Sequence, residues 1–366
     1  MLSRMTPLSL VPFSGQAPAR KGEKPEENWF HGKDGSRAER LATKLGLALP
    51  HSERPVQANP LAPRSPFLPG LNRFAVIGDS GSCNPTQAAI AMQMKKTFDR
   101  APFQTVLALG DNVYENGEPA HFYQAVYQAY QALFESGVRF LPVMGNHDVR
   151  KRHLSYLGEK QLRYFDVPRY YRFQLASDPR GKNAVDFFAI DTTVMLPGYD
   201  KCYESKEETK LARAIAKEQI EWLERQLSQS KAAFKVVYGH YPMYSSGPHA
   251  QKEGEILAKL QRKLEPLLIK HGVDLYMAGH EHLYERSEPI HGVTHVVSGA
   301  AGKLDKADFS TPAKSFTRAV GAAANHFMLF EIKPQGLAFQ VITSDGSVID
   351  SGLLTKKAAP KTLAYA

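Results

Sequence analysis

The feature of this chain that most constrains its fold is a series of five glycine-containing motifs, each placed directly after an apolar run. The motifs are GDSG at 78–81, GDNVY at 110–114, GNHD at 145–148, GHYP at 239–242 and GHEH at 279–282. The preceding runs, such as Phe74–Ile77 and Leu275–Ala278, have the composition of buried β-strands. Loops that leave buried strands carry most binding sites in layered α/β folds, and glycine allows the sharp turn. We therefore expect the five motifs to meet at one site.

The side chains within these motifs are of the kind that bind hard or borderline metal ions. They are Asp79, Asp111, Tyr114, Asn146, His240, His280 and His282. Carboxylate, amide, phenol and imidazole donors suit iron, zinc or manganese better than a metal that prefers thiolates. Taken singly, a Gly-Asp pair at a strand end is also a common turn, and Gly-His-x-His is also an ordinary polar loop. Repetition of the pattern after five strands favours a dinuclear metal centre.

The order of the five motifs resembles that of the calcineurin-like metallophosphoesterases and, within them, of the purple acid phosphatases. Further matches are Phe188–Thr192, Trp222-Leu223 and Val297–Ala300, and the resemblance covers roughly 73 to 344. It is closest to the short, tartrate-resistant type, although Leu283–Ser287 is similar to the larger plant-type members. The resemblance implies a layered α/β fold, the four-layer α/β/β/α sandwich of two mixed sheets. Alternating strand and helix patterns along the chain agree with such a fold.

Carried over by position, the resemblance implies two metal sites that share one carboxylate. The ligands of the first metal, ferric iron, would be Asp79, Asp111, Tyr114 and His282. The ligands of the second, a divalent iron, zinc or manganese ion, would be Asp111, Asn146, His240 and His280. Asp111 would then bridge two ions about 3.5–4 Å apart, the separation at which they hold both oxygens of an in-line displacement. A phenolate from Tyr114 favours Fe(III), whereas in isolation this tyrosine would simply pack against the following helix.

Three further residues have catalytic roles by the same resemblance. His147 would hydrogen-bond phosphate oxygens, and His249, nine residues after His240, matches the family's candidate general acid. A lone loop histidine is otherwise more often just solvated. Asp148 would orient either His147 or an amide of the turn. The implied reaction is in-line attack on phosphorus by a hydroxide that the metals hold, with protonation of the leaving oxygen by His249.

The leading functional hypothesis is therefore a metal-dependent hydrolase of phosphate monoesters, an acid phosphatase of purple type. A phosphodiesterase that acts on cyclic nucleotides or other phosphodiesters is the alternative, because the same metal centre serves both reactions. Loops around 150–166 and 302–316 would decide between them, and they carry no readable motif. A non-hydrolytic metal-binding, phosphate-binding or redox role is a third possibility. The natural substrate, the second metal and the oligomeric state are not readable from the sequence.

The chain divides into three parts by composition. Residues 71–350 hold all the motifs and form the catalytic domain, with helices expected at about 86–99, 118–134, 208–230 and 254–271. The preceding 1–70 is rich in proline and charged residues and is expected to be an extended or partly disordered arm, with a short helix only at 37–49. The last segment, 351–366, is expected to be a flexible tail.

Charge and hydrophobicity exclude several kinds of partner. The net charge of +9 comes from 46 basic and 37 acidic residues that are interleaved, so no nucleic-acid interface is expected. No run is long enough to span a membrane. The amino-terminal apolar stretch is broken by prolines and makes a poor signal peptide, which favours a cytoplasmic protein. A periplasmic or secreted location is the alternative, and two cysteines do not decide between them.

Overall fold

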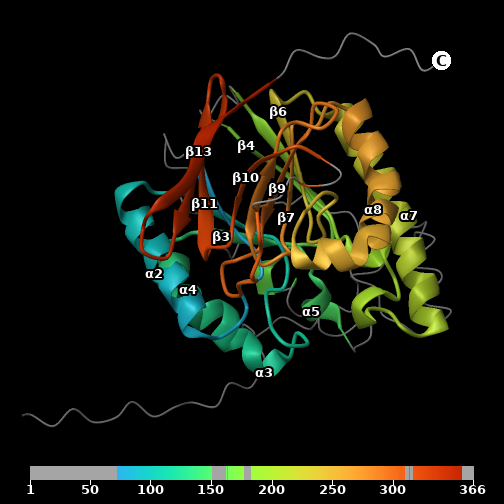
Figure 1. The fold of residues 1–366 in the computed structure, drawn as a ribbon, viewed down its shortest axis with the longest axis horizontal. Coiled ribbons are helices and arrows are strands. Elements are labelled where there is room, and N and C mark those ends of the chain that lie inside the picture. The colour runs from blue at the N-terminus through green and yellow to red at the C-terminus, as the bar shows by residue number, and fades with distance from the viewer. Residues whose placement is uncertain are drawn as a thin grey trace, which may run out of the picture. The chain divides into compact units, whose positions relative to one another are not determined.

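The computed structural model describes residues 72–150, 162, 164–176, 183–309, 313 and 316–356 (Figure 1). Contacts divide the chain into Met1–Ser36 and Arg37–Ala366, and every described residue belongs to the second unit. The arm expected at 1–70 and the helix expected at 37–49 lie outside the described residues. None of the helices in the described part of the chain has the length and apolar content needed to span a bilayer.

The first sheet is mixed and has the strand order β13-β12-β11-β1-β2-β3. Its strands are β1 (Arg73–Ile77), β2 (Thr105–Ala108), β3 (Arg139–Pro142), β11 (His326–Lys333), β12 (Gly336–Thr343) and β13 (Val348–Thr355). The three strands β1, β2 and β3 run parallel, and β11 joins β1 in antiparallel fashion. Three motif loops therefore leave the same edge of this sheet.

The second sheet is also mixed, with the strand order β10-β8-β9-β7-β6-β5-β4. Its strands are β4 (Tyr171–Leu175), β5 (Val185–Ala189), β6 (Phe234–Tyr238), β7 (Leu275–Ala278), β8 (Tyr284–Ser287), β9 (Thr294–Ser298) and β10 (Arg318–Ala322). Strands β5, β6, β7 and β9 are parallel, and the remaining pairs are antiparallel. The other two motif loops follow β6 and β7.

Aromatic side chains join the two sheets face to face. Phe74 of β1 stacks on Phe330 of β11 with ring centroids 4.8 Å apart and meets Phe187 of β5 edge-on at 5.0 Å. All three rings are fully buried, and the Tyr238 hydroxyl donates to the backbone oxygen of Leu141 across the interface at 3.2 Å. Burial of large aromatic side chains supplies much of the hydrophobic stabilisation of such a core.

Helices cover the outer face of each sheet, as Figure 1 shows with α2 and α4 on one side and α7 and α8 on the other. On the side of the first sheet lie α2 (Pro85–Arg100) and α4 (Ala129–Glu135), and α4 follows α3 (Pro119–Phe122) and the π-helical η1 (Tyr123–Gln128) in the chain. On the side of the second sheet lie α7 (Lys206–Gln229) and α8 (Pro248–Lys270), and the short helices are α5 (Asn146–Val149), η2 (Thr193–Met195) and η3 (Tyr199–Lys201). The predicted four-layer α/β/β/α sandwich of two mixed sheets is confirmed.

The sequence placed all five strands before the motifs correctly, but three of its boundaries need correction. The helix expected at 118–134 is divided into α3, η1 and α4, and Tyr130 has non-helical angles (φ −115°, ψ 18°). Helix α8 starts at Pro248 rather than Gly254, with a kink at Glu253 that interrupts the apolar periodicity. Strand β13 continues to Thr355, so the flexible tail expected from 351 is wrong for 351–355.

The reason for the last error is that β13 forms through backbone pairing with β12, and its mostly exposed side chains give little apolar alternation. Residues 357–366 of the expected tail lie outside the described part.

Candidate metal centre

All five motif loops leave the carboxyl ends of parallel strands and meet at one edge of the sandwich. The backbones approach closely there: a Cβ on Gly145 would lie 2.1 Å from Asp111 Oδ1, so only glycine fits. Asp79, Asp111 and His280 have φ values of 54°, 52° and 70°, in the left-handed region that such residues rarely adopt. Strained residues of this kind, held by the surrounding strands, are common at functional sites.

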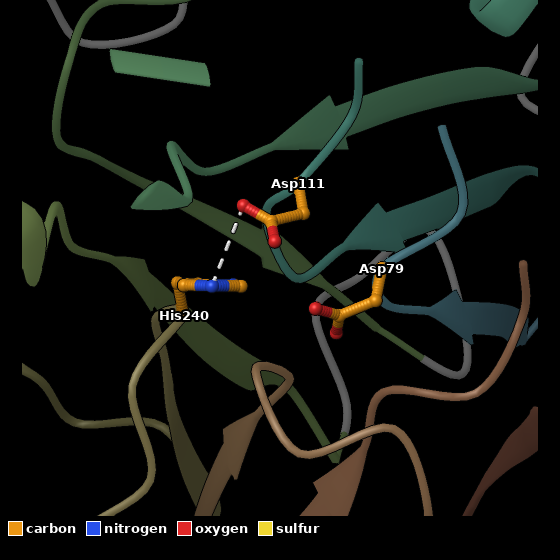
Figure 2. Close-up of side chains that lie close together, drawn as sticks. All are labelled: Asp79, Asp111 and His240. Carbon is orange, nitrogen blue, oxygen red and sulfur yellow. Dashed lines mark ion pairs between the residues drawn. The ribbon is translucent and has the colours of Figure 1, made fainter. Parts of the chain in front are cut away.

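The centre of the site is formed by Asp79, Asp111 and His240, whose ligand atoms all lie within 4.8 Å of one another (Figure 2). All three side chains are buried. His240 Nδ1 donates to the backbone oxygen of Leu109 at 2.8 Å, so Nε2 carries the lone pair of the neutral ring. This Nε2 lies 2.7 Å from Asn146 Oδ1 and 3.5 Å from Asp111 Oδ1. Three electron-pair donors therefore face one another, the arrangement that a cation holds together.

A second group of donors adjoins the first around Asp79. The Tyr114 hydroxyl donates to Asp79 Oδ1 at 3.2 Å and lies 3.3 Å from His282 Nε2. His282 Nε2 is itself 3.6 Å from Asp79 Oδ1. Tyr114, Asp79 and His282 thus converge beside the central cluster, and Asp111 lies between the two groups of donors. The structure brings together all seven residues that the motifs predict as ligands.

Each of the three histidines is oriented through the ring nitrogen that faces away from the cluster. The outer nitrogen of His240, Nδ1, donates to the backbone oxygen of Leu109, and the outer nitrogen of His282, Nδ1, lies 3.2 Å from Asp305 Oδ1. His280 Nε2 lies 3.3 Å from Glu253 Oε2, which leaves Nδ1 as the atom able to bind a metal. A carboxylate or carbonyl partner on the outer nitrogen is the usual companion of a metal-binding histidine. Sequence reasoning missed Glu253 and Asp305, because neither stands in a motif.

The electrostatics of the cluster match a site for cations. Burial of the Asp79 carboxyl, together with the charge of Asp111, raises the pKa of Asp79 well above its usual range. Burial acts on Asp111 in the same direction, but His240 and His147 outweigh it and lower the pKa of Asp111. Burial also lowers the pKa of His240 and of His280, so both rings are neutral at neutral pH and available as ligands. The donor set present therefore fits bound metal ions.

The sequence matches the family described as calcineurin-like phosphoesterase over residues 72–284. The chain belongs to the calcineurin-like phosphoesterase family. It is 26% identical over 309 residues to tartrate-resistant acid phosphatase type 5 of Oryctolagus cuniculus, covering 78% of this chain and 91% of the relative. It is 31% identical over 256 residues to purple acid phosphatase 17 of Arabidopsis thaliana, covering 66% of this chain and 71% of the relative. The resemblance predicted from the motifs is confirmed, and the chain is a hydrolase of phosphate esters.

Solved structures share the fold of this phosphoesterase. Purple acid phosphatase PPD1 from yellow lupin (Lupinus luteus) superposes with a TM-score of 0.58 at 20% identity, covering 80% of this chain and 57% of that chain. GAP50, described as the anchor in the inner membrane complex of Plasmodium, has a TM-score of 0.60 at 21% identity, covering 79% of this chain and 90% of that chain. At these identities the likeness concerns the fold alone.

Asp148 of the phosphoesterase orients amides of the motif loops. Its buried carboxylate accepts from the backbone N–H groups of Asn112 at 3.0 Å, Val113 at 3.1 Å and Gly145 at 2.9 Å. The sequence left open whether Asp148 orients His147 or an amide of the turn. The contacts of its carboxylate are with backbone amides of the turns, not with His147. By this means the GNHD loop holds the GDNVY loop, and with it Asp111, in position.

His147 lies beside the cluster, with its ring centroid 4.4 Å from that of Tyr114. Its backbone N–H donates to Asp111 Oδ1 at 2.9 Å, and its ring Nδ1 lies 2.6 Å from the backbone oxygen of Glu115. Since that carbonyl requires a proton on Nδ1, Nε2 is the remaining ring atom, 4.0 Å from Asp111 Oδ2. The side chain is only 14% exposed, so this nitrogen lies close to the metal ligands rather than in bulk solvent.

His249 stands in the first turn of α8, next to His280 and His282. Its ring centroid lies 4.8 Å from that of His280 and 5.6 Å from that of His282. Nδ1 faces two carboxylates, Glu281 Oε2 at 3.4 Å and Asp305 Oδ2 at 3.5 Å. The hydrogen bond that His249 Nδ1 donates to Glu281 raises the pKa of His249 above its ordinary value.

Charged side chains from the two predicted substrate loops lie at the rim. Arg150 and the Asn146 amide both donate to the Asp200 carboxylate, which stands on η3. Lys303 Nζ lies 2.9 Å from Glu115 Oε1 and 4.3 Å above the Tyr114 ring. Arg150 and Lys303 belong to the segments that the sequence singled out, while Asp200 had no signal. Residues 151–161, 163, 310–312 and 314–315 of those segments lie outside the described part.

Proposed function

We propose that this protein is a dinuclear-metal phosphatase that hydrolyses phosphate monoesters in the manner of purple acid phosphatases. The observation that carries the proposal is the convergence of two groups of donors on either side of Asp111. One group would hold the first metal through Asp79, Asp111, Tyr114 and His282. The other would hold the second metal through Asp111, Asn146, His240 and His280.

The phenol of Tyr114 supports iron in the ferric state at the first site. Burial, and then the charges of Asp111 and Asp79, raise the pKa of Tyr114 well above its usual range. Such a phenol keeps its proton beside two carboxyl groups unless a highly charged cation takes the place of that proton. A trivalent ion has that charge, and iron, zinc or manganese in the divalent state would suit the imidazole and amide donors of the second site.

Bound metal ions would supply charge stabilisation of the transferring phosphoryl group and a water of lowered pKa. The protein's own residues would bind and orient the ester. In the form that carries a proton on both ring nitrogens, His147 would donate from Nε2 to a phosphate oxygen close to Asp111. His249 would protonate the departing oxygen, because its Nδ1 is directed at carboxylates and Nε2 is the atom left to hold a transferable proton.

The test is phosphate release from a panel of monoesters and diesters by protein loaded with iron and a divalent metal, from acidic to neutral pH. Asp111→Asn should lose metal and activity together, because it removes the shared carboxylate. Asp99→Asn makes the same chemical change on helix α2, at a side chain that is 56% exposed, and should retain both.

Monoester turnover that is abolished in Asp111→Asn and kept in Asp99→Asn is the expected result. Selective cleavage of diesters would replace the proposal with a phosphodiesterase. Turnover of neither class by metal-loaded protein would replace it with a metal-binding or redox role.

A further inference from the structure

Glu281 has the one side chain of the GHEH motif, apart from the glycine, that is not a predicted metal ligand, although it is only 1% exposed. Its carboxylate points to the first turn of α8 rather than to the cluster of ligands. Oε2 accepts the backbone N–H of His249 at 3.2 Å, and Oε1 accepts the backbone N–H of Ala250. These are two of the first N–H groups of a helix, which have no partner within the helix itself.

The start of α8 is built to receive this carboxylate. Its N-cap residue is Gly247, which has no side chain to accept from the first turn. A Cβ on Gly247 would lie 2.2 Å from Glu281 Oε2, so a larger residue would displace the carboxylate. Glu281 thus acts as the cap of α8 from a loop that follows another strand, and a negative group is favoured at this end of a helix.

The same carboxylate also contacts the imidazole of the first turn. Glu281 Oε2 lies 3.4 Å from His249 Nδ1, and Asp305 Oδ2 faces the same nitrogen from the loop after β9 at 3.5 Å. The backbone and the ring of His249 are therefore both tied to Glu281. Because Glu281 stands between His280 and His282 in the chain, one loop positions two predicted metal ligands and the candidate proton donor.

We propose that Glu281 is a positioning residue that fixes the ring of His249 for proton transfer to the leaving oxygen. This role rests on the proposed phosphatase function. Glu281 does not touch the ester; it sets the direction of the His249 ring through a backbone cap and a contact with Nδ1. A glutamine at this position has one acceptor oxygen, so it cannot accept both amides and also face the Nδ1 proton.

The experiment compares Glu281→Gln with a matched variant, Glu285→Gln. Glu285 is a second buried carboxylate that holds the same loop, through Ser245 Oγ at 2.9 Å and the backbone N–H of Ser246 at 2.9 Å, without touching His249. For each protein the measurements are bound metal, turnover of an alkyl and an aryl phosphate monoester, and hydrogen exchange of the α8 amides.

General acid catalysis contributes typically 10²–10⁴-fold and matters most for poor leaving groups. Glu281→Gln should therefore keep its metal and lose about 10-fold or more of the alkyl turnover, with aryl turnover changed less than about 2-fold. Glu285→Gln should leave the ratio of the two esters as in wild type. Added to His249→Ala, the Glu281→Gln change should cause no further loss with the alkyl ester. In the single variant Glu281→Gln, the amides of His249 and Ala250 should exchange faster than in wild type.

Several results would overturn the role of Glu281. They are an equal loss on both esters, a fall in bound metal that accounts for the loss, an additive loss in the double variant, or unchanged exchange of the two amides. A wild-type protein that is inactive on every ester would instead refute the proposed phosphatase function, and the proton-transfer role with it. An active wild type with an unchanged ester ratio in Glu281→Gln refutes only the positioning role.

Discussion

A buried histidine away from the candidate metal centre should make the free energy of unfolding fall as the pH falls. His326 begins strand β11 and is fully buried. Its Nδ1 donates to the backbone oxygen of Ala324 at 2.8 Å, so Nε2 accepts from the Ser298 hydroxyl at 2.9 Å. The neutral ring is thus fully hydrogen-bonded, and burial lowers the pKa of His326 from 6.5 to about 4.

The direction of the effect follows from the two pKa values. Between pH 6.5 and about 4 the unfolded chain binds a proton at His326 that the folded protein does not, so stability falls as the pH falls. The stability that the neutral His326 ring contributes is fully present above pH 6.5, its pKa in the unfolded chain. It is lost progressively as the pH falls to about 4, its pKa in the folded protein. The difference between the two pKa values, about 2.5, corresponds to about 3.5 kcal/mol at about 1.4 kcal/mol for each unit, and about 3 kcal/mol of this is lost by pH 4, where the folded protein is half protonated at His326.

The assay is urea unfolding of wild type and His326→Gln at a series of pH values between about 7 and about 4. The variant loses stability at neutral pH because its amide fits the two partners less well, but it has no proton to gain. The difference in free energy of unfolding between wild type and variant should therefore shrink by about 3 kcal/mol on acidification. Carboxylates that both proteins contain affect the two curves equally and do not contribute to this difference. Two curves that stay parallel within about 1 kcal/mol across this range would refute the reasoning.

Two further predictions concern the metal centre. Tyr114→Phe should fold and bind metal yet lack the broad visible charge-transfer band that a phenolate on ferric iron produces, and an absorption spectrum in which the band persists would exclude Tyr114 as the ligand. Asp148→Asn should lower the free energy of unfolding by about 2–4 kcal/mol and weaken metal retention, because an amide cannot accept from all three backbone N–H groups that the carboxylate holds. Urea unfolding and metal analysis measure both effects, and a variant with wild-type values for each would contradict them.

The predicted ligands could be recognised because their signal is local. An apolar run followed by glycine and a metal-binding side chain indicates a strand end with a site, whatever the rest of the fold. The five runs are strands, and the predicted ligands that follow them adjoin one another in the structure, with Asp79, Asp111 and His240 at the centre. The long helix α7 was also predicted, at about 208–230. In the structure it spans Lys206–Gln229, and a capping box of Ser205 and Glu208, which the prediction did not use, marks its start.

The residues that orient those ligands could not be recognised in the same way. Glu253 lies 27 residues before His280, and Asp305 lies 23 residues after His282. In the sequence each is an ordinary acidic residue with no spacing that sets it apart from a solvated surface group. Their role follows only from which imidazole nitrogen each one faces.

Residue chemistry and local periodicity, which the sequence carries by itself, determined the set of predicted metal ligands and the alternation of strands and helices around them. The tertiary structure alone decided that Glu281 caps α8, that Asp148 holds the loop of Asp111 and that β13 extends the first sheet. The physical reason is that these features depend on distances between segments far apart in the chain. Such distances are set by how the two sheets pack, which no local pattern encodes.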